Sequence, residues 1–107
     1  MIKKIKIGGF EVKNDNKLFL IAGPCVIENR DHALNHAKMI KQICDELALD
    51  FVFKSSFDKA NRTNINSSRG VGIEKGLEIL NEIKNSLNVP VLTDVHESYQ
   101  CDLLKEV

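Results

Sequence analysis

The sequence lacks a net charge, since its 107 residues include 15 Lys and Arg and 15 Asp and Glu. It has no basic field of the kind that binds nucleic acid or an anionic membrane surface, so we expect neither as a partner. It also lacks long apolar runs and the pattern of a signal peptide, so we expect a cytoplasmic protein. Cysteine is scarce: Cys25, Cys44 and Cys101 are odd in number and widely spaced, which fits reduced thiols better than a disulfide framework.

What is present is ordinary for a globular protein, with 43% hydrophobic and 28% charged residues. Residues 1–17 alternate isoleucine and lysine around Gly8-Gly9, a pattern that predicts a small β-hairpin. The lysines of this segment could form a basic patch. Lysine on the exposed face of an edge strand also prevents pairing with other chains, and we favour that interpretation.

From residue 18 onward, short apolar runs alternate with segments of helical periodicity. Continuous runs at 18–22, 51–53 and 89–92 predict parallel strands that are covered on both faces. Between them, apolar residues recur every third or fourth position over 31–48 and 72–87, which predicts two amphipathic helices.

The helix starts carry capping residues. Asp31 is the expected cap of the first helix, and Cys44 and Leu47 lie on its apolar stripe. Ser98 is the expected cap of a third helix, whose apolar side would carry Cys101, Leu104 and Val107.

This order of strands and helices predicts an α/β fold with a parallel sheet and right-handed crossovers. An eight-stranded (β/α) barrel needs about 250 residues, so this chain holds only its first three units. Three strands and a hairpin would form an open sheet with poorly covered faces. We therefore expect residues 1–17 to form a hairpin and residues 18–107 to form three β/α units, the amino-terminal part of a larger protein.

In parallel α/β folds, functional groups gather where the strands end, because the following loops share one face. The three strand ends here are followed by Gly23-Pro24-Cys25, by the segment 54–62 and by the segment 93–97. Lys54 directly follows a buried strand, where an unpaired charge is costly, and an anionic ligand would compensate it. Two further cations and several neutral donors follow, and could hold a carboxylate and phosphates: Lys59, Arg62, Ser55, Ser56, Asn61, Thr63 and Asn64. The alternative is a solvated loop of mixed charge, since Asp58 lies among the bases.

Other residues on this rim allow two interpretations each. Cys25 could ligate a divalent metal or act as a nucleophile, or be a small buried hydrophobe. His96 is the nearest conceivable metal partner, or a loop residue held by hydrogen bonds. Asp94 could accept hydrogen bonds from substrate hydroxyls or cap a helix. The glycines of Gly70-Val71-Gly72 could present backbone N–H groups to phosphate or only form a turn.

The motifs together are specific. The chain resembles the amino-terminal portion of the 3-deoxy-D-manno-octulosonate 8-phosphate synthases, which condense phosphoenolpyruvate with arabinose 5-phosphate on the route to the lipopolysaccharide sugar. The resemblance rests on Leu20-Ile21-Ala22-Gly23-Pro24-Cys25, on the nine residues from Lys54 to Arg62 and on Thr93-Asp94-Val95-His96-Glu97. The related synthases that extend erythrose 4-phosphate share the Gly-Pro-Cys turn but carry a different basic motif after the second strand, which makes them a distant second.

The resemblance implies a transferase that is a homotetramer of TIM barrels, so that residues 18–107 are the first three β/α units of an incomplete TIM barrel. It assigns phosphoenolpyruvate to Lys54, Ser56 and Lys59, of which the two lysines are catalytic. It assigns arabinose 5-phosphate to Lys59, Asn61, Arg62 and Thr63, with Arg62 on the phosphate. Cys25 places the chain with the metal-dependent members, which bind a divalent ion of the Zn, Fe or Mn type through three further ligands much later in the chain.

This chain departs from its relatives at a few positions. Thr63 replaces the usual serine, Asn66 the usual histidine and Ser68 an aromatic residue, which puts the packing of the sugar-binding loop in question. An alternative is a truncated, inactive chain with at most weak anion binding. A small zinc protein with Cys and His ligands is disfavoured, because there is no close ligand pair such as Cys-x-x-Cys.

Overall fold

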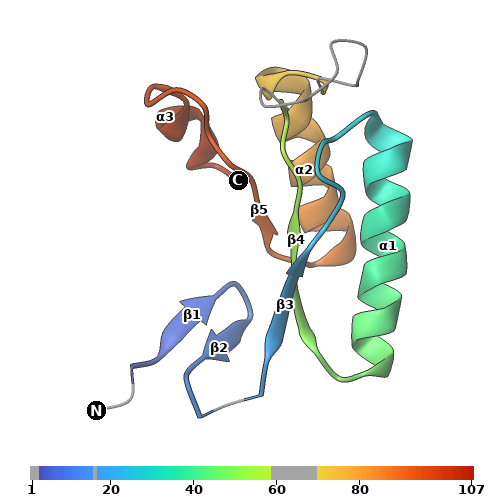
Figure 1. The fold of residues 1–107 in the computed structure, drawn as a ribbon, viewed down its shortest axis with the longest axis vertical. Coiled ribbons are helices and arrows are strands. Elements are labelled where there is room, and N and C mark those ends of the chain that lie inside the picture. Colours follow the sequence, from blue (N-terminus) through green and yellow to red (C-terminus); the bar gives the residue numbers. More distant parts are fainter. Residues whose placement is uncertain (1–2, 16, 59–69) are drawn as a thin grey trace.

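The structure is a computed structural model that describes residues 3–15, 17–58 and 70–107. It is an α/β structure with a two-stranded antiparallel sheet and a three-stranded parallel sheet (Figure 1). In chain order its elements are β1 (Ile5–Ile7), β2 (Phe10–Val12), β3 (Phe19–Ala22), α1 (Arg30–Glu46), β4 (Asp50–Lys54), α2 (Ile73–Leu87), β5 (Val91–Leu92) and α3 (Gln100–Leu104). Within the described ranges, no helix has the length and apolar content that crossing a bilayer requires.

The predicted hairpin is confirmed and lies at the amino end of the parallel sheet (Figure 1). β1 and β2 pair from Ile5 opposite Val12 to Ile7 opposite Phe10, and the turn needs glycine because Gly8 has φ of +53°. The hairpin contacts the sheet twice. Gly8 packs against the ring of Pro90, and the Phe10 ring lies 5.8 Å from that of Phe19.

The predicted parallel sheet is also confirmed, with strand order β3-β4-β5. Helices α1 and α2 lie side by side against it (Figure 1), and a core of apolar side chains fills the space between them. Burial of these side chains supplies the main favourable term for folding. The residues buried most deeply in this core are Ile27, Ala33, Ala37, Cys44, Phe53, Ile79, Leu80 and Ile83.

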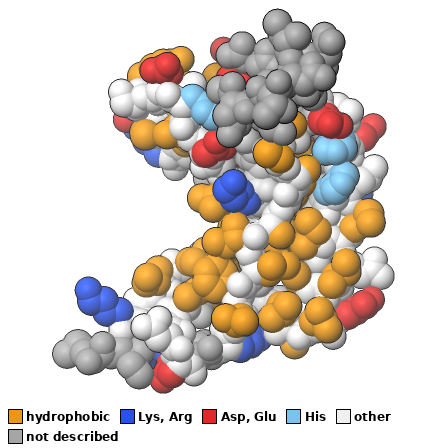
Figure 2. Space-filling model, in the orientation of Figure 1, with side chains coloured by type: hydrophobic (Ala, Val, Ile, Leu, Met, Phe, Trp, Pro, Cys, Tyr) orange, Lys and Arg blue, Asp and Glu red, His pale blue; other side chains and the backbone are white. Residues whose placement is uncertain are grey.

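Apolar runs of this kind are typical of strands covered on both faces, but the expectation that three strands and a hairpin form an open, poorly covered sheet is confirmed for β3 and β5. Leu20 and Ile21 are 37% and 44% exposed, and Leu92 is 41% exposed. Figure 2 shows hydrophobic side chains gathered on the open face of the molecule. Because β3 and β5 are the edges of this three-stranded sheet, neither has a neighbour on its outer side.

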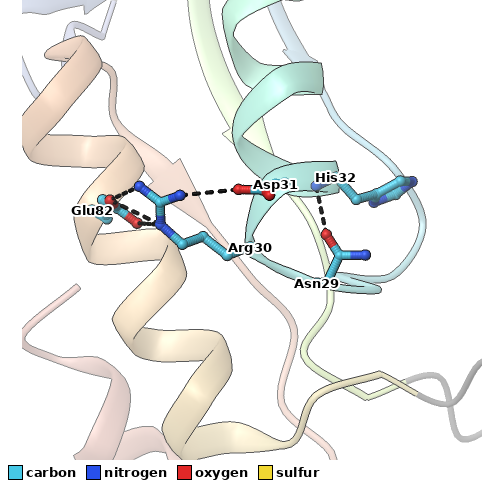
Figure 3. Close-up of polar contacts among 5 residues, drawn as sticks. All are labelled: Asn29, Arg30, Asp31, His32 and Glu82. Atoms are coloured by element: carbon cyan, nitrogen blue, oxygen red, sulfur yellow. Dashed lines mark hydrogen bonds and ion pairs between the residues drawn. The ribbon is translucent and has the colours of Figure 1, made fainter.

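Two of the predicted caps are wrong. Asn29, not Asp31, caps α1: its Oδ1 accepts a hydrogen bond from the backbone N–H of His32 at 2.8 Å (Figure 3). Both side chains are good acceptors, and the helix simply begins one residue earlier than predicted. Ser98 does not cap α3, which follows Tyr99 and ends at Leu104 rather than at Val107. Leu47 is also misplaced, since it lies beyond α1 and is 63% exposed.

An ion pair joins α1 to α2 at the protein surface (Figure 3). The guanidinium of Arg30 donates hydrogen bonds to both carboxylate oxygens of Glu82, at 2.6 Å from Nη2 and 2.8 Å from Nε. It also donates to Asp31 at 3.0 Å. The bidentate geometry ties the first turn of α1 to the middle of α2 and fixes their relative rotation.

Glu82→Gln is expected to make stability less dependent on pH in the acid range. Hydrogen bonds from Arg30, and its charge, hold the pKa of Glu82 below the usual 4.5. Such a carboxyl stabilises the fold above its unfolded-state pKa, and the contribution is lost as pH falls through the folded-state pKa. Urea unfolding should therefore give a small advantage of the native chain over E82Q at neutral pH that disappears below pH 4.5.

The matched control is Glu78→Gln, on the same helix, because the carboxylate of Glu78 lies 3.7 Å from the ammonium of Lys75 and makes no bidentate contact. An advantage over E82Q that is the same at acid and neutral pH would contradict the role given to Arg30.

Candidate functional site

The three polar segments predicted to share a rim do follow neighbouring strand ends. In the sheet register Ala22 of β3 is opposite Phe53 of β4, and Lys54 of β4 is opposite Leu92 of β5. The carboxyl ends of the three strands therefore lie at the same end of the sheet, which we call the rim. The rim is toward the top of Figure 1, at the opposite end of the sheet from the hairpin.

Beyond the strand ends, the first two loops continue side by side. The N–H of Ser56 donates to the carbonyl of Cys25 at 3.2 Å, and the N–H of Ile27 donates to the carbonyl of Ser56 at 2.8 Å. The buried hydroxyl of Ser55 donates to the carbonyl of Pro24 at 2.6 Å. These bonds fix the cysteine turn against the Lys54–Asp58 segment.

The close approach of these two backbone segments requires glycine at position 23. A Cβ placed there would lie 1.8 Å from the carbonyl oxygen of Lys54 and 3.1 Å from the ring of Phe53. The glycine of the Gly-Pro-Cys turn therefore allows the backbones of the first two loops to come into contact.

Lys54 and Ser56 have different environments. The side chain of Lys54 is exposed at the end of β4, and no described residue pairs with its ammonium group. The expected cost of an unpaired buried charge therefore does not arise in this chain. Ser56 is buried, and its hydroxyl donates to the carbonyl of Asp58 at 2.6 Å and accepts from the Asp58 N–H at 3.2 Å. In this structure Ser56 holds the turn of the loop.

Phe57 anchors the same loop to α2. Its side chain is 2% exposed, and its carbonyl accepts a hydrogen bond from the N–H of Gly72 at 3.1 Å. A Cβ at Gly70 would lie 2.4 Å from that carbonyl oxygen, and one at Gly76 would lie 2.5 Å from the Cβ of Phe57. The N–H of Gly72 is thus already used, and the turn interpretation of Gly70-Val71-Gly72 is the one the structure supports.

The remaining basic and polar candidates lie outside the described residues: Lys59, Asn61, Arg62 and Thr63, together with Asn64, Asn66 and Ser68. Their roles remain predictions.

The third segment brings Asp94 and His96 together. The Nε2 atom of His96 lies 3.7 Å from a carboxylate oxygen of Asp94, and its ring meets the ring of Phe57 edge-on, with centroids 5.5 Å apart. Buried Gln100 accepts hydrogen bonds from the N–H groups of His96 and Glu97, at 2.8 and 3.0 Å. His96 is therefore a loop residue held by hydrogen bonds. Sequence reasoning missed Gln100, because glutamine is usually exposed and nothing in the pattern marks it as buried.

The cysteines differ in exposure. Cys25 and Cys101 are exposed, whereas Cys44 is buried in the core, where desolvation raises the pKa of its thiol and the charge of Asp45 adds to the effect. A buried thiol with a raised pKa is unreactive. Among the described residues, no three His, Cys, Asp or Glu side chains form a group that could hold a metal ion. Cys25 alone does not make a metal site.

A groove among the described residues lies at the other end of the sheet. It has a volume of about 660 Å³ and lies between the hairpin and the amino end of the sheet, beside Phe10, Pro90 and Lys84. Two of its cationic side chains already have partners within the chain. Lys41 pairs with Asp45 at 2.8 Å, and Lys84 donates a hydrogen bond to the carbonyl of Val107. The chemistry-bearing side chains are on the opposite rim.

A sequence model of the DAHP synthetase I family matches residues 3–107. The chain belongs to the DAHP synthetase I family. This agrees with the resemblance that the rim motifs suggested.

The relatives carry one name, 2-dehydro-3-deoxyphosphooctonate aldolase, which is another name for the synthase that the motifs indicated. The protein from Rickettsia typhi is 52% identical over 101 residues, 94% of this chain and 37% of the relative. That from Aromatoleum aromaticum is 59% identical over 86% of this chain and 33% of the relative. That from Legionella pneumophila (strain Corby) is 56% identical over 87% of this chain and 34% of the relative. The chain thus spans about a third of the length of these relatives.

Proposed function

We propose that this chain contributes the phosphoenolpyruvate-binding rim of a 3-deoxy-D-manno-octulosonate 8-phosphate synthase, a transferase with two small-molecule substrates. The observation that carries the proposal is the ammonium group of Lys54. It is exposed at the end of β4 and without a partner among the described residues, and hydrogen bonds tie the loop that follows it to the Cys25 turn. The relatives' name supports the same reaction. A binding-only role is not favoured, because those relatives are named as enzymes.

The fold proposal is that residues 1–17 form a hairpin at the amino end of a TIM barrel and residues 18–107 its first three β/α units. The exposed edge strands β3 and β5 support this, because a closed barrel gives every strand two neighbours. Exposed apolar residues on the outer side of α1, Met39 and Ile43, would likewise be covered by a neighbouring helix. We further propose that the complete enzyme is a cytoplasmic homotetramer.

In the proposed reaction, C3 of phosphoenolpyruvate forms a bond to the aldehyde carbon of arabinose 5-phosphate. Water adds at C2, and the C2–O bond to phosphate then breaks to release inorganic phosphate. Lys54, and Lys59 by the resemblance, would offset the negative charge of two anionic substrates that must be brought together. Asp94, half-exposed on the same rim, would accept hydrogen bonds from sugar hydroxyls. By the resemblance, Ser56 would contact phosphoenolpyruvate beside Lys54, and Lys59, Asn61, Arg62 and Thr63 would bind the sugar phosphate.

A divalent metal ion of the Zn, Fe or Mn type is part of the proposal for the complete enzyme, with Cys25 as one ligand. The exposed thiol of Cys25 suits this role. The described residues do not supply a full ligand set, and so no step above is assigned to the metal.

The test is a chimera in which this chain replaces the matching segment of the Rickettsia typhi relative. We expect it to release phosphate from phosphoenolpyruvate only when arabinose 5-phosphate is present. The 107-residue chain alone is expected to release none, because one metal ligand cannot fix the ion. A chimera that folds, by circular dichroism, and releases no phosphate with this sugar would refute the proposed function. Erythrose 4-phosphate serves as the control aldose.

A further inference from the structure

His96 makes three described contacts that fix it between two loops of the rim. Its Nε2 atom faces the Asp94 carboxylate at 3.7 Å, its ring lies edge-on against the ring of Phe57, and its backbone N–H donates to Gln100. Asp94 and His96 belong to the loop after β5, whereas Phe57 belongs to the loop after β4, which directly follows Lys54.

Two of the residues that contact His96, Phe57 and Gln100, are more firmly held than the third, Asp94. Phe57 is buried and tied to the start of α2 through Gly72, and Gln100 is buried at the start of α3. The Asp94 side chain is 46% exposed, and among the described residues its charged partner is His96. The imidazole thus connects an exposed carboxylate to the packed part of the rim.

We propose that His96 is a positioning residue that holds Asp94 toward the sugar substrate and sets the distance of Asp94 from the loop that follows Lys54. The inference rests on the proposed function, because it assigns the sugar hydroxyls to Asp94. Two substrates that must form a bond need their binding groups in a fixed relative position, and small displacements reduce the rate strongly. His96 supplies such a link, because it contacts one residue of each loop.

The experiment measures steady-state kinetics of the chimera with His96→Leu and His96→Gln. Leucine keeps an apolar contact with Phe57 and removes the group that faces Asp94, whereas the glutamine amide can donate a hydrogen bond at about the position of Nε2. We expect H96L to raise the KM for arabinose 5-phosphate about tenfold, because Asp94 loses the imidazole nitrogen that faces it at 3.7 Å. The KM for phosphoenolpyruvate should change less than about twofold, and H96Q should recover most of the loss.

A double-substitution cycle with Asp94→Asn tests whether His96 acts through Asp94. H96L should add little in the D94N background if the two residues act as a unit. His36→Leu, which removes a histidine from the outer helix α1, is the matched control and should leave both KM values unchanged.

Each outcome decides the inference. An unchanged sugar KM in H96L, equal increases in both KM values with a lower Tm, or additive effects with D94N would overturn it while leaving the proposed function intact. If the unsubstituted chimera shows no sugar-dependent phosphate release, the proposed function fails and the inference fails with it.

Discussion

Gly23→Ala is expected to destabilise the protein by about 3 kcal/mol and to abolish activity, since overpacking against backbone reaches this range or more. The added methyl group would lie 1.8 Å from the carbonyl oxygen of Lys54, and 2.8 Å from its carbonyl carbon. Backbone cannot rotate away as a flexible side chain can, so the first two loops must separate. Separation would break the hydrogen bond from Ser56 to Cys25 and displace Lys54. Guanidinium unfolding of the chimera, followed by circular dichroism, measures the effect.

The matched control is Gly9→Ala, in the hairpin turn. A Cβ at this position meets nothing within 4 Å, and Gly9 does not have a positive φ. The control should change stability by less than about 0.5 kcal/mol. Equal unfolding midpoints for G23A and G9A would show that the two loops do not approach as closely as the structure describes.

The strands and helices could be predicted from the sequence because their signals are local. Continuous apolar runs such as 51–53 and the three-to-four periodicity of 73–87 require no knowledge of distant residues. Helix ends were less predictable. Asn29 and Asp31 are both good caps, and only the path of the incoming chain decides which of them accepts from His32.

The candidate site was predictable in outline only. Parallel strands must end at one edge, so the rim could be expected to collect Cys25, Lys54 and Asp94. The contacts between the loops could not be predicted. They depend on the distances between backbone segments, which the pattern of residue types does not specify. The need for glycine at position 23 and the hydrogen bonds to buried Gln100 are both of this kind. The exposure of β3 and β5, by contrast, could be expected from the small number of strands, because the outer strands of a three-stranded sheet each lack a neighbour on one side.

Lys54→Met is expected to lower kcat/KM of the chimera by about 10² to 10³, the range found when a group that stabilises transition-state charge is removed. Methionine keeps the length and apolar stem of lysine and removes the ammonium group. Since that group is exposed and unpaired among the described residues, its loss breaks no ion pair, and the fold should be kept. Phosphate release at varied phosphoenolpyruvate concentrations measures the effect, and thermal unfolding verifies the fold.

The matched control for this substitution is Lys4→Met, an exposed lysine that precedes β1 at the opposite end of the sheet. K4M should keep full activity. Salt should also weaken phosphoenolpyruvate binding less in K54M than in the unsubstituted chimera, because the charge that ionic strength screens is gone. A K54M chimera with full activity would show that the exposed ammonium at the end of β4 is solvated rather than functional. That result would favour the alternative interpretation of this segment, a solvated loop of mixed charge in which Asp58 lies among the basic residues.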